Sequence, residues 1–127
     1  MSDSLVVGDM TLTRVLLMND ARWPWLILAP RRNGVVELID LDAADRAQLI
    51  EEAASAAGFL KAHTGAHKIN LGALGNIVRQ LHLHVVARAP GDPAWPGPVW
   101  GHGAARRYGE REAAALIEAA RLALKTE

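Results

Sequence analysis

Short apolar runs separated by turn residues dominate the first third of the chain and predict β-strands. Leu12–Met18 is mostly β-branched or aliphatic and predicts one strand, and Trp25–Ala29 predicts a second. Val35–Ile39 predicts a third. The Asn33-Gly34 pair between the last two runs favours a hairpin, because both residue types tolerate positive φ. We therefore expect two of these strands to be antiparallel neighbours.

A helical period follows. Asp42 has the chemistry of an N-cap, and Asp45 lies in a first turn that favours negative charge. Apolar positions then recur at about helical spacing, and Thr64-Gly65 ends the helix. These positions are Leu49, Ala53, Ala57 and Leu60.

The second half of the chain predicts two more strands and a second helix. His67–Ala73 and Ile77–Ala87 are the expected strands, and Glu110–Lys125 is the expected helix. Between them, residues 89–103 are rich in Pro and Gly and predict a long irregular loop. The order strand, strand, strand, helix, strand, strand, helix indicates an α+β fold, with a five-stranded antiparallel sheet covered by two main helices. At 127 residues the chain forms a single domain, residues 1–127, with a core at about 12–100 and the C-terminal helix at about 110–125.

The charge balance, the lack of cysteine and the lack of long apolar segments exclude several classes of function. Lys and Arg number 14 and Asp and Glu number 14, so the zero formal charge argues against bulk nucleic-acid binding and against a basic membrane-binding surface. The absence of cysteine excludes disulfides, thiolate metal sites and cysteine nucleophiles. No signal peptide or membrane span is evident, and we expect a cytoplasmic protein.

Candidate chemistry is concentrated in the expected strand Ile77–Ala87. Because side chains alternate across a sheet, Gln80, His82 and His84 should share one face, with leucine and valine on the other. Three interpretations remain open from spacing alone: a solvent-facing strand that carries two histidines, a zinc site that lacks further ligands at a recognisable spacing, and nucleophilic catalysis by a neutral imidazole.

Residues 75–88, GNIVRQLHLHVVAR, resemble the signature of the histidine triad (HIT) superfamily, in which three histidines alternate with apolar residues. The resemblance covers about Leu12 to Trp100 and includes the apolar strand that ends in Pro30 and two arginines, and Asp40-Leu41 before the first helix. It implies a HIT-like fold and a nucleotide substrate.

The sequence departs from the family pattern at several polar positions. Gln80 stands where the first triad histidine is expected, and Asn33 and Trp25 stand at positions where the family often has histidine. Gly75-Asn76 replaces a Gly-Gln pair, and Ala87 replaces a proline. His82 and His84 keep the middle and last triad positions, so we expect altered rate, pH dependence or leaving-group preference rather than loss of chemistry.

The resemblance assigns a role to each candidate residue. His82 is the expected nucleophile toward the α-phosphate, with one nitrogen fixed by a backbone carbonyl, and His84 and Gln80 complete the catalytic set. Expected substrate contacts are Asp20 to the ribose, Asn70 and Asn76 on the phosphate side, and Gly75 in the turn. Trp95 is expected either as a lid or wall beside the leaving group or as part of a rigid loop that packs on the body or on a second subunit. His63 and His67 are expected to be ordinary surface residues.

Two function classes remain open on this basis. The first is hydrolysis of a nucleoside phosphoramidate or a dinucleoside polyphosphate through a nucleotidyl-histidine intermediate. The alternative is a catalytically weak purine-nucleotide-binding module. The resemblance implies no required metal or other cofactor, although the substrate can arrive as a magnesium complex, and it implies a homodimer.

Overall fold

The computed structural model describes residues 3–127 and confirms the α+β fold, with one five-stranded antiparallel sheet and two main helices. The strands lie side by side in the order β1-β2-β3-β5-β4. The elements in chain order are β1 Ser4–Asp9, β2 Thr13–Met18, β3 Trp25–Pro30, the 3-10 turn Leu38–Asp40, α1 Ala43–Thr64, β4 Lys68–Gly72, β5 Leu83–Arg88 and α2 Glu110–Leu124.

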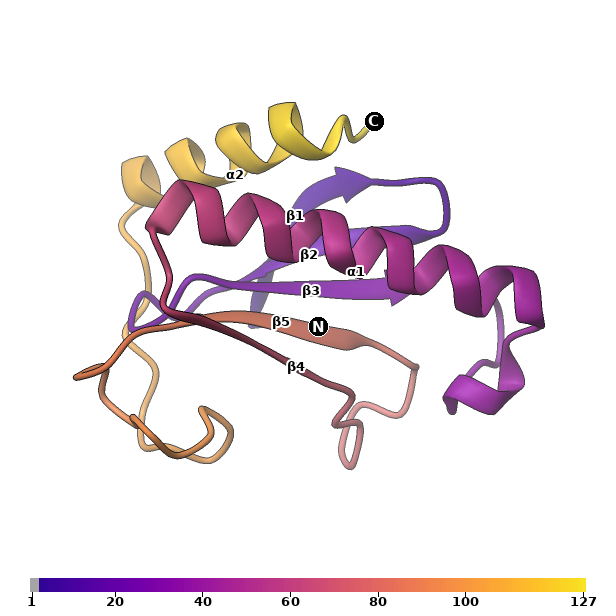
Figure 1. Cartoon of the computed structure of the whole chain (residues 1–127), viewed down its shortest axis with the longest axis horizontal. Coiled ribbons are helices and arrows are strands. Elements are labelled where there is room, and N and C mark those ends of the chain that lie inside the picture. The colour runs from indigo at the N-terminus through magenta and orange to yellow at the C-terminus, as the bar shows by residue number, and fades with distance from the viewer. Residues whose placement is uncertain (1–2) are drawn as a thin grey trace.

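The sheet separates two apolar layers. Both helices lie over the same face, as Figure 1 shows, and the main core lies between that face and α1 and α2. Leu60 of α1, Val85 of β5 and Ala120 of α2 are fully buried there. The opposite face carries a smaller apolar cluster that includes Trp23, Trp25 and Val99. The loop between β5 and α2 covers this second face, and His84 of β5 contacts Trp100 of that loop.

The boundaries of α1 follow from its capping residues, as the sequence predicted. The Asp42 side chain accepts a hydrogen bond from the backbone N–H of Asp45 at 2.8 Å. At the other end Gly65 adopts φ 67°, the left-handed conformation that closes many helices, and its N–H bonds to the carbonyl of Lys61.

The predicted strand Val35–Ile39 is wrong, and so is the hairpin before it. Asn33 and Gly34 do form a turn, with φ 73° at Gly34, but β3 is already paired with β2 on one edge and β5 on the other. The chain after the turn has no free edge of β3 to join. It folds instead into the 3-10 turn, where the carboxylate of Asp40 accepts the N–H groups of Val36 and Glu37.

The fifth strand of the sheet is β1, which the sequence analysis did not predict. It forms an antiparallel pair with β2, in which Leu5 lies opposite Leu17. Its apolar stretch is only three residues long, Leu5 to Val7, before Gly8.

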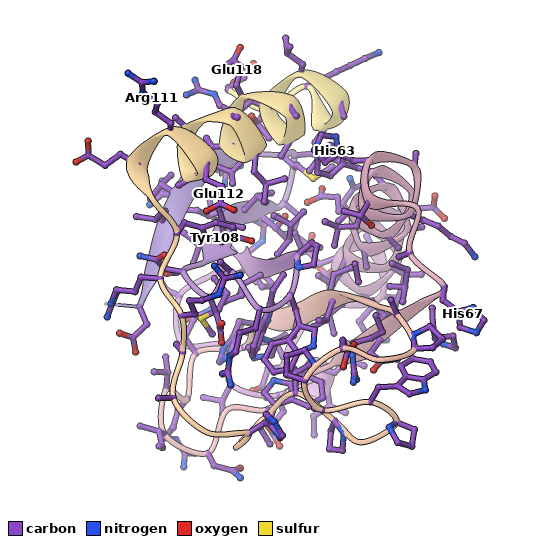
Figure 2. All side chains as sticks on the ribbon, turned by 90° about the vertical axis from the view of Figure 1, so that its left-hand side faces the viewer. His63, His67, Tyr108, Arg111, Glu112 and Glu118 are labelled. Carbon is purple, nitrogen blue, oxygen red and sulfur yellow. The ribbon has the colours of Figure 1, made fainter. Side chains whose placement is uncertain are left out.

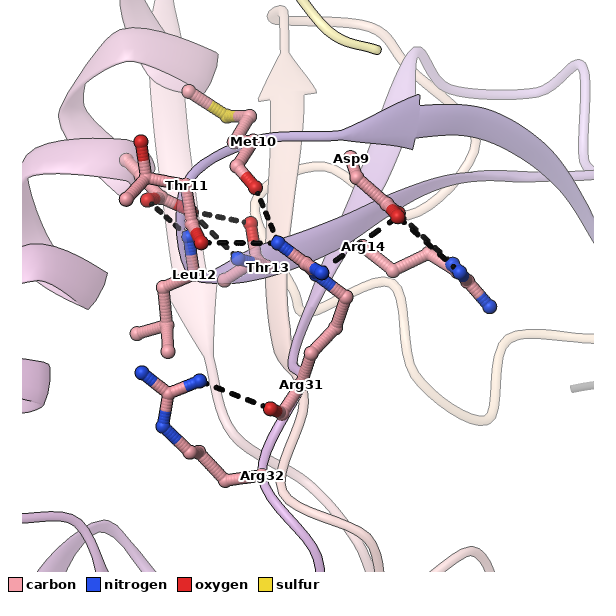
Figure 3. A network of polar contacts seen from close by, with 9 residues as sticks. Asp9, Met10, Thr11, Leu12, Thr13, Arg14, Arg31 and Arg32 are labelled. Atoms are coloured by element: carbon pink, nitrogen blue, oxygen red, sulfur yellow. Dashed lines mark hydrogen bonds and ion pairs between the residues drawn. The ribbon is translucent and has the colours of Figure 1, made fainter.

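A buried carboxylate secures the turn between β1 and β2. Glu52 of α1 is 2% exposed and accepts hydrogen bonds from the N–H of Leu12, and from both the N–H and the hydroxyl of Thr13, at 2.7–2.9 Å. On the outer side of the turn, the Arg31 guanidinium donates to the carbonyls of Met10 and Thr11 (Figure 3). These contacts tie α1 to the β1–β2 hairpin.

Within residues 3–127, neither helix has the combination of length and apolar character needed to cross a membrane.

Candidate active site

His82 precedes β5 and is held through the backbone. The sequence predicted a strand over Ile77–Ala87, but β5 begins only at Leu83, because its pairing with β3 and β4 ends at Leu83 and His84. Residues 73–82 are a loop, in which the Leu81 N–H bonds to Val35 O rather than to a sheet neighbour. His82 Nδ1 lies 2.6 Å from the carbonyl oxygen of Gln80. Since a carbonyl oxygen only accepts, Nδ1 carries a proton, and in the neutral ring Nε2 then has the free lone pair.

His84 has the opposite arrangement. The indole N–H of Trp25, on the neighbouring strand β3, donates to His84 Nδ1 at 2.9 Å. Burial, and secondarily the nearby His82, lower the pKa of His84 from 6.5 to about 4, while a hydrogen bond with the Leu74 backbone acts in the other direction. His84 is therefore neutral at pH 7 with its proton on Nε2.

The two imidazole rings meet edge to face, with centroids 4.9 Å apart. Each carries a different group: His82 a lone pair on Nε2, and His84 an N–H that is hydrogen-bonded to the Leu74 backbone in this structure. A nucleophilic nitrogen beside a hydrogen-bond donor is the arrangement that attack on a phosphorus or carbonyl centre requires.

Two cavities open on either side of His82. The smaller, about 370 Å³, is lined by both histidines together with Met18, Ile27 and Trp100. The larger, about 580 Å³, lies toward the 3-10 turn and is lined by His82, Gln80 and Gly75. His82 and Asn76 belong to both linings.

The structure thus brings five of the predicted site residues to the two cavities: His82 and Asn76 line both, His84 lines the smaller, and Gly75 and Gln80 line the larger. Gly75 sits where the loop folds tightly, since a β-carbon there would lie 3.0 Å from the carbonyl oxygen of Val78. Gln80 lies with His82 on the larger cavity, but its side chain donates to the carbonyl of Pro30 at 3.3 Å and does not share the smaller cavity with His84. Its backbone, not its amide, supports His82.

Asp20 lies away from both cavities. It is 4% exposed and forms an ion pair with Arg22 at 2.8 Å, and it also accepts the N–H groups of Arg22 and Arg106. Burial alone would raise its pKa, but these hydrogen bonds outweigh that effect and leave the pKa of Asp20 below its usual value.

Asn70 and Trp95 belong to a second polar network at the far end of β5, rather than to the cavity linings. Arg88 is 2% exposed and donates to Asn70 Oδ1, to both carboxylate oxygens of Asp92 and to the carbonyl of Gly97. The Trp95 ring lies beside Arg88, 5.7 Å from its guanidinium carbon. This network ties the loop after β5 to the sheet.

Two tryptophans that contact His84 were not predicted as site residues. Trp100 lines the smaller cavity, with its ring centroid 5.5 Å from that of His84, and its ring packs where Gly72 has no side chain. Trp25 was noted only as a departure from the family pattern. The signal available in the sequence was the register of the strands: a residue near the start of an apolar strand can face the histidine strand beside it.

The other histidines lie away from His82. His63 is exposed at the end of α1 and His67 is exposed just before β4, as Figure 2 shows. His102 is exposed in the loop after β5 and contacts Trp23. Among residues 3–127, no three His, Asp or Glu side chains gather closely enough to hold a metal ion.

Comparison with known proteins gives consistent matches. Residues 1–91 match the HIT domain family. A histidine triad protein from Sinorhizobium meliloti superposes with a TM-score of 0.92 at 48% identity, covering 99% of this chain and 91% of that one. Histidine triad proteins from Bradyrhizobium japonicum and Marinobacter aquaeolei give 0.94 at 44% and 40% identity, covering 97% and 98% of this chain and 92% and 90% of theirs. No curated protein matches the sequence.

Proposed function

Because the chain belongs to the histidine triad family, we propose that it is a nucleotide hydrolase or transferase that attacks the α-phosphate of a nucleoside phosphoramidate or a dinucleoside polyphosphate. His82 is the nucleophile and forms a nucleotidyl-histidine intermediate. The observation that supports this proposal is the pair of complementary tautomers, a free Nε2 on His82 beside an N–H on His84, at the wall of one cavity.

The chain's own groups perform the steps as follows. The Gln80 carbonyl holds the proton on Nδ1 and aims Nε2 of His82. The Nε2–H of His84 stabilises negative charge on a non-bridging phosphate oxygen, a contribution typically worth about 10²–10³ in rate for one donor. Asn76, which lines both cavities, is a second donor to the phosphate. Water then hydrolyses the intermediate and releases the nucleoside monophosphate.

The test is AMP release from adenosine phosphoramidate and from diadenosine tetraphosphate, with His82→Ala as the inactive variant. We expect release by the wild-type protein and none by His82→Ala, while AMP binding by calorimetry persists. Binding without release by the wild-type protein would favour a nucleotide-binding module. Undiminished release by His82→Ala would overturn the role of His82.

The proposed chemistry uses an imidazole nucleophile and therefore needs no resident metal. Magnesium enters only with a polyphosphate substrate, so EDTA should leave AMP release from the phosphoramidate unchanged.

We also propose that two copies associate as a homodimer. β4 forms one of the two edges of the sheet, and its Leu71 is 53% exposed. Light scattering coupled to size exclusion should give twice the mass of the 13.7 kDa chain.

A further inference from the structure

The hydrogen bond between Trp25 and His84 constrains the chemistry of the site. An indole N–H can donate but cannot accept, so the 2.9 Å contact requires an unprotonated Nδ1 on His84. Protonation of His84 would place two N–H groups against each other. Trp25 is 5% exposed and its ring packs edge to face against both Trp23 and Trp100, so it has little freedom to turn away.

One contact opposes this constraint, because the hydrogen bond between His84 and the Leu74 backbone favours a protonated ring, but the effect of burial is larger. Ile27 and Gly72 flank it on β3 and β4, and Trp100 covers it from the loop after β5. The ionisable groups of the described residues that share its cavity are His82 and Asp3, and Asp3 forms an ion pair with Arg107.

His82 cannot donate a proton to the leaving group while its Nε2 acts as the nucleophile. Gln80 has no titratable proton. Glu37 and Arg79 line only the larger cavity on the other side of His82. The smaller cavity therefore has a nucleophile and a neutral N–H donor. Among the described residues it has no group in an acidic form that could protonate a leaving group.

We propose that Trp25 is a positioning residue that holds His84 as the neutral Nε2–H tautomer, and that the site in consequence acts on phosphoric anhydrides rather than on phosphoramidates. This inference rests on the proposed function and selects between its two substrate classes.

The proton requirement of the leaving group explains why anhydrides are favoured over phosphoramidates. The lone pair of His82 Nε2 forms a bond to the α-phosphorus as the bond to the bridging oxygen breaks, and that oxygen keeps the electron pair and leaves as a phosphate anion. Water then attacks the phosphorus, the N–P bond breaks with its electron pair returning to Nε2, and the proton of water passes to solvent. An amine leaving group differs, because its nitrogen must gain a proton as the P–N bond breaks, and neutral His84 could supply one only by becoming an imidazolate.

The first experiment reads the tautomer directly, without substrate. Long-range ¹H–¹⁵N spectra of the imidazoles should show His84 Nδ1 unprotonated in the wild-type protein and in Trp100→Phe. Trp25→Phe, which keeps an aromatic ring but loses the N–H, should show an upward shift of the His84 titration, because Nδ1 can then take up a proton. Trp100→Phe is the matched control because its ring also touches His84 but donates nothing to it. A protonated Nδ1 in the wild-type protein would overturn the role of Trp25, even if Trp25→Phe failed to fold.

The second experiment tests the substrate class. We expect AMP release from diadenosine tetraphosphate to exceed release from adenosine phosphoramidate by about 10²-fold, the lower end of what a positioned acid contributes. In Trp25→Phe the difference should narrow at pH 6, because His84 can then be protonated. Equal or faster release from the phosphoramidate by the wild-type protein would overturn the substrate class. Release from neither substrate would overturn the proposed function and the substrate class together, while the spectra would still decide the role of Trp25.

Discussion

At the scale of single residues, the support of His82 comes from a carbonyl that any residue at position 80 would supply. Gln80→Ala removes the amide and its bond to Pro30 but leaves the carbonyl at 2.6 Å from His82 Nδ1. We predict that AMP release falls by less than about tenfold, since one neutral hydrogen bond is worth about 1 kcal/mol. Initial rates of Gln80→Ala and His82→Ala, measured side by side, check this. A loss in Gln80→Ala as complete as in His82→Ala would show that the amide itself takes part.

Asp20 provides a second prediction at this scale. Its carboxylate is already taken up by Arg22 and by the N–H of Arg106, and it lines neither cavity beside His82. We therefore expect little discrimination between ribose and 2′-deoxyribose substrates. Competing hydrolysis of the adenosine and 2′-deoxyadenosine tetraphosphate dinucleotides measures the ratio directly. A strong preference for the ribose form, lost in Asp20→Asn, would mean that the ion pair opens when substrate binds.

How well the site could be predicted depended on the range of the interactions that build it. The proximity of His82 to His84 and the carbonyl contact to His82 were accessible from the motif, because the residues involved are two apart in the chain. Trp25 and Trp100 were not, because their contacts with His84 span long stretches of sequence and depend on strand order and on the course of a loop. The face expected to be shared by Gln80, His82 and His84 assumed that all three lie in one strand. Because β5 begins only at Leu83, Gln80 is outside it and its side chain does not share the smaller cavity with His84.

At the scale of elements, Glu52 is the link between α1 and the β1–β2 hairpin. Its carboxylate satisfies two backbone N–H groups and the hydroxyl of Thr13, all buried. Glu52→Gln keeps the shape but turns one acceptor into a donor that faces other donors. We predict a loss of about 3 kcal/mol in the free energy of unfolding, measured by urea denaturation.

Glu51→Gln is the matched control for this prediction, because Glu51 is its exposed neighbour on the same helix. It should change the free energy of unfolding by less than about 0.5 kcal/mol. Equal effects of the two substitutions would show that the buried contacts of Glu52 contribute no specific stability.

The elements themselves differ in how far local sequence determines them. The boundaries of α1 were predictable because its capping residues act within one turn of the helix. The strand expected at Val35–Ile39 does not form because β3 is already paired with β2 on one edge and with β5 on the other. A local apolar run carries no information about which strands pair. β1 went unpredicted because three apolar residues become a strand only once β2 offers them an edge.

At the scale of the whole molecule, the lowered pKa of His84 links folding to pH. Below pH 6.5 the unfolded chain binds a proton at this position that the folded chain does not bind until about pH 4. The free energy of unfolding should therefore fall between these values, by about 3 kcal/mol in total from this group. The carboxylates with lowered pKa values, Asp9, Asp20, Asp40 and Asp92, begin to lose their stabilising effect only as the pH approaches the unfolded value of 3.8, so they contribute little over most of this window.

Urea denaturation at a series of pH values measures this dependence. His84→Gln should flatten it between pH 6.5 and 4, whereas the exposed-site control His63→Gln should not. A slope that survives in His84→Gln would have to be assigned to another group.

The absence of a side chain at Gly72 has a consequence for inhibition. A β-carbon there would lie 2.7 Å from the ring of Trp100, which walls the smaller cavity. Overpacking of this kind typically costs about 1–3 kcal/mol unless the neighbour moves, and the free space available to Trp100 is the cavity itself. We predict that Gly72→Ala weakens AMP binding in calorimetry while the fold persists, and unchanged affinity would mean that Trp100 yields in another direction. The displaced Trp100 ring would then occupy part of the nucleotide site in every molecule, and a higher AMP concentration could not remove it.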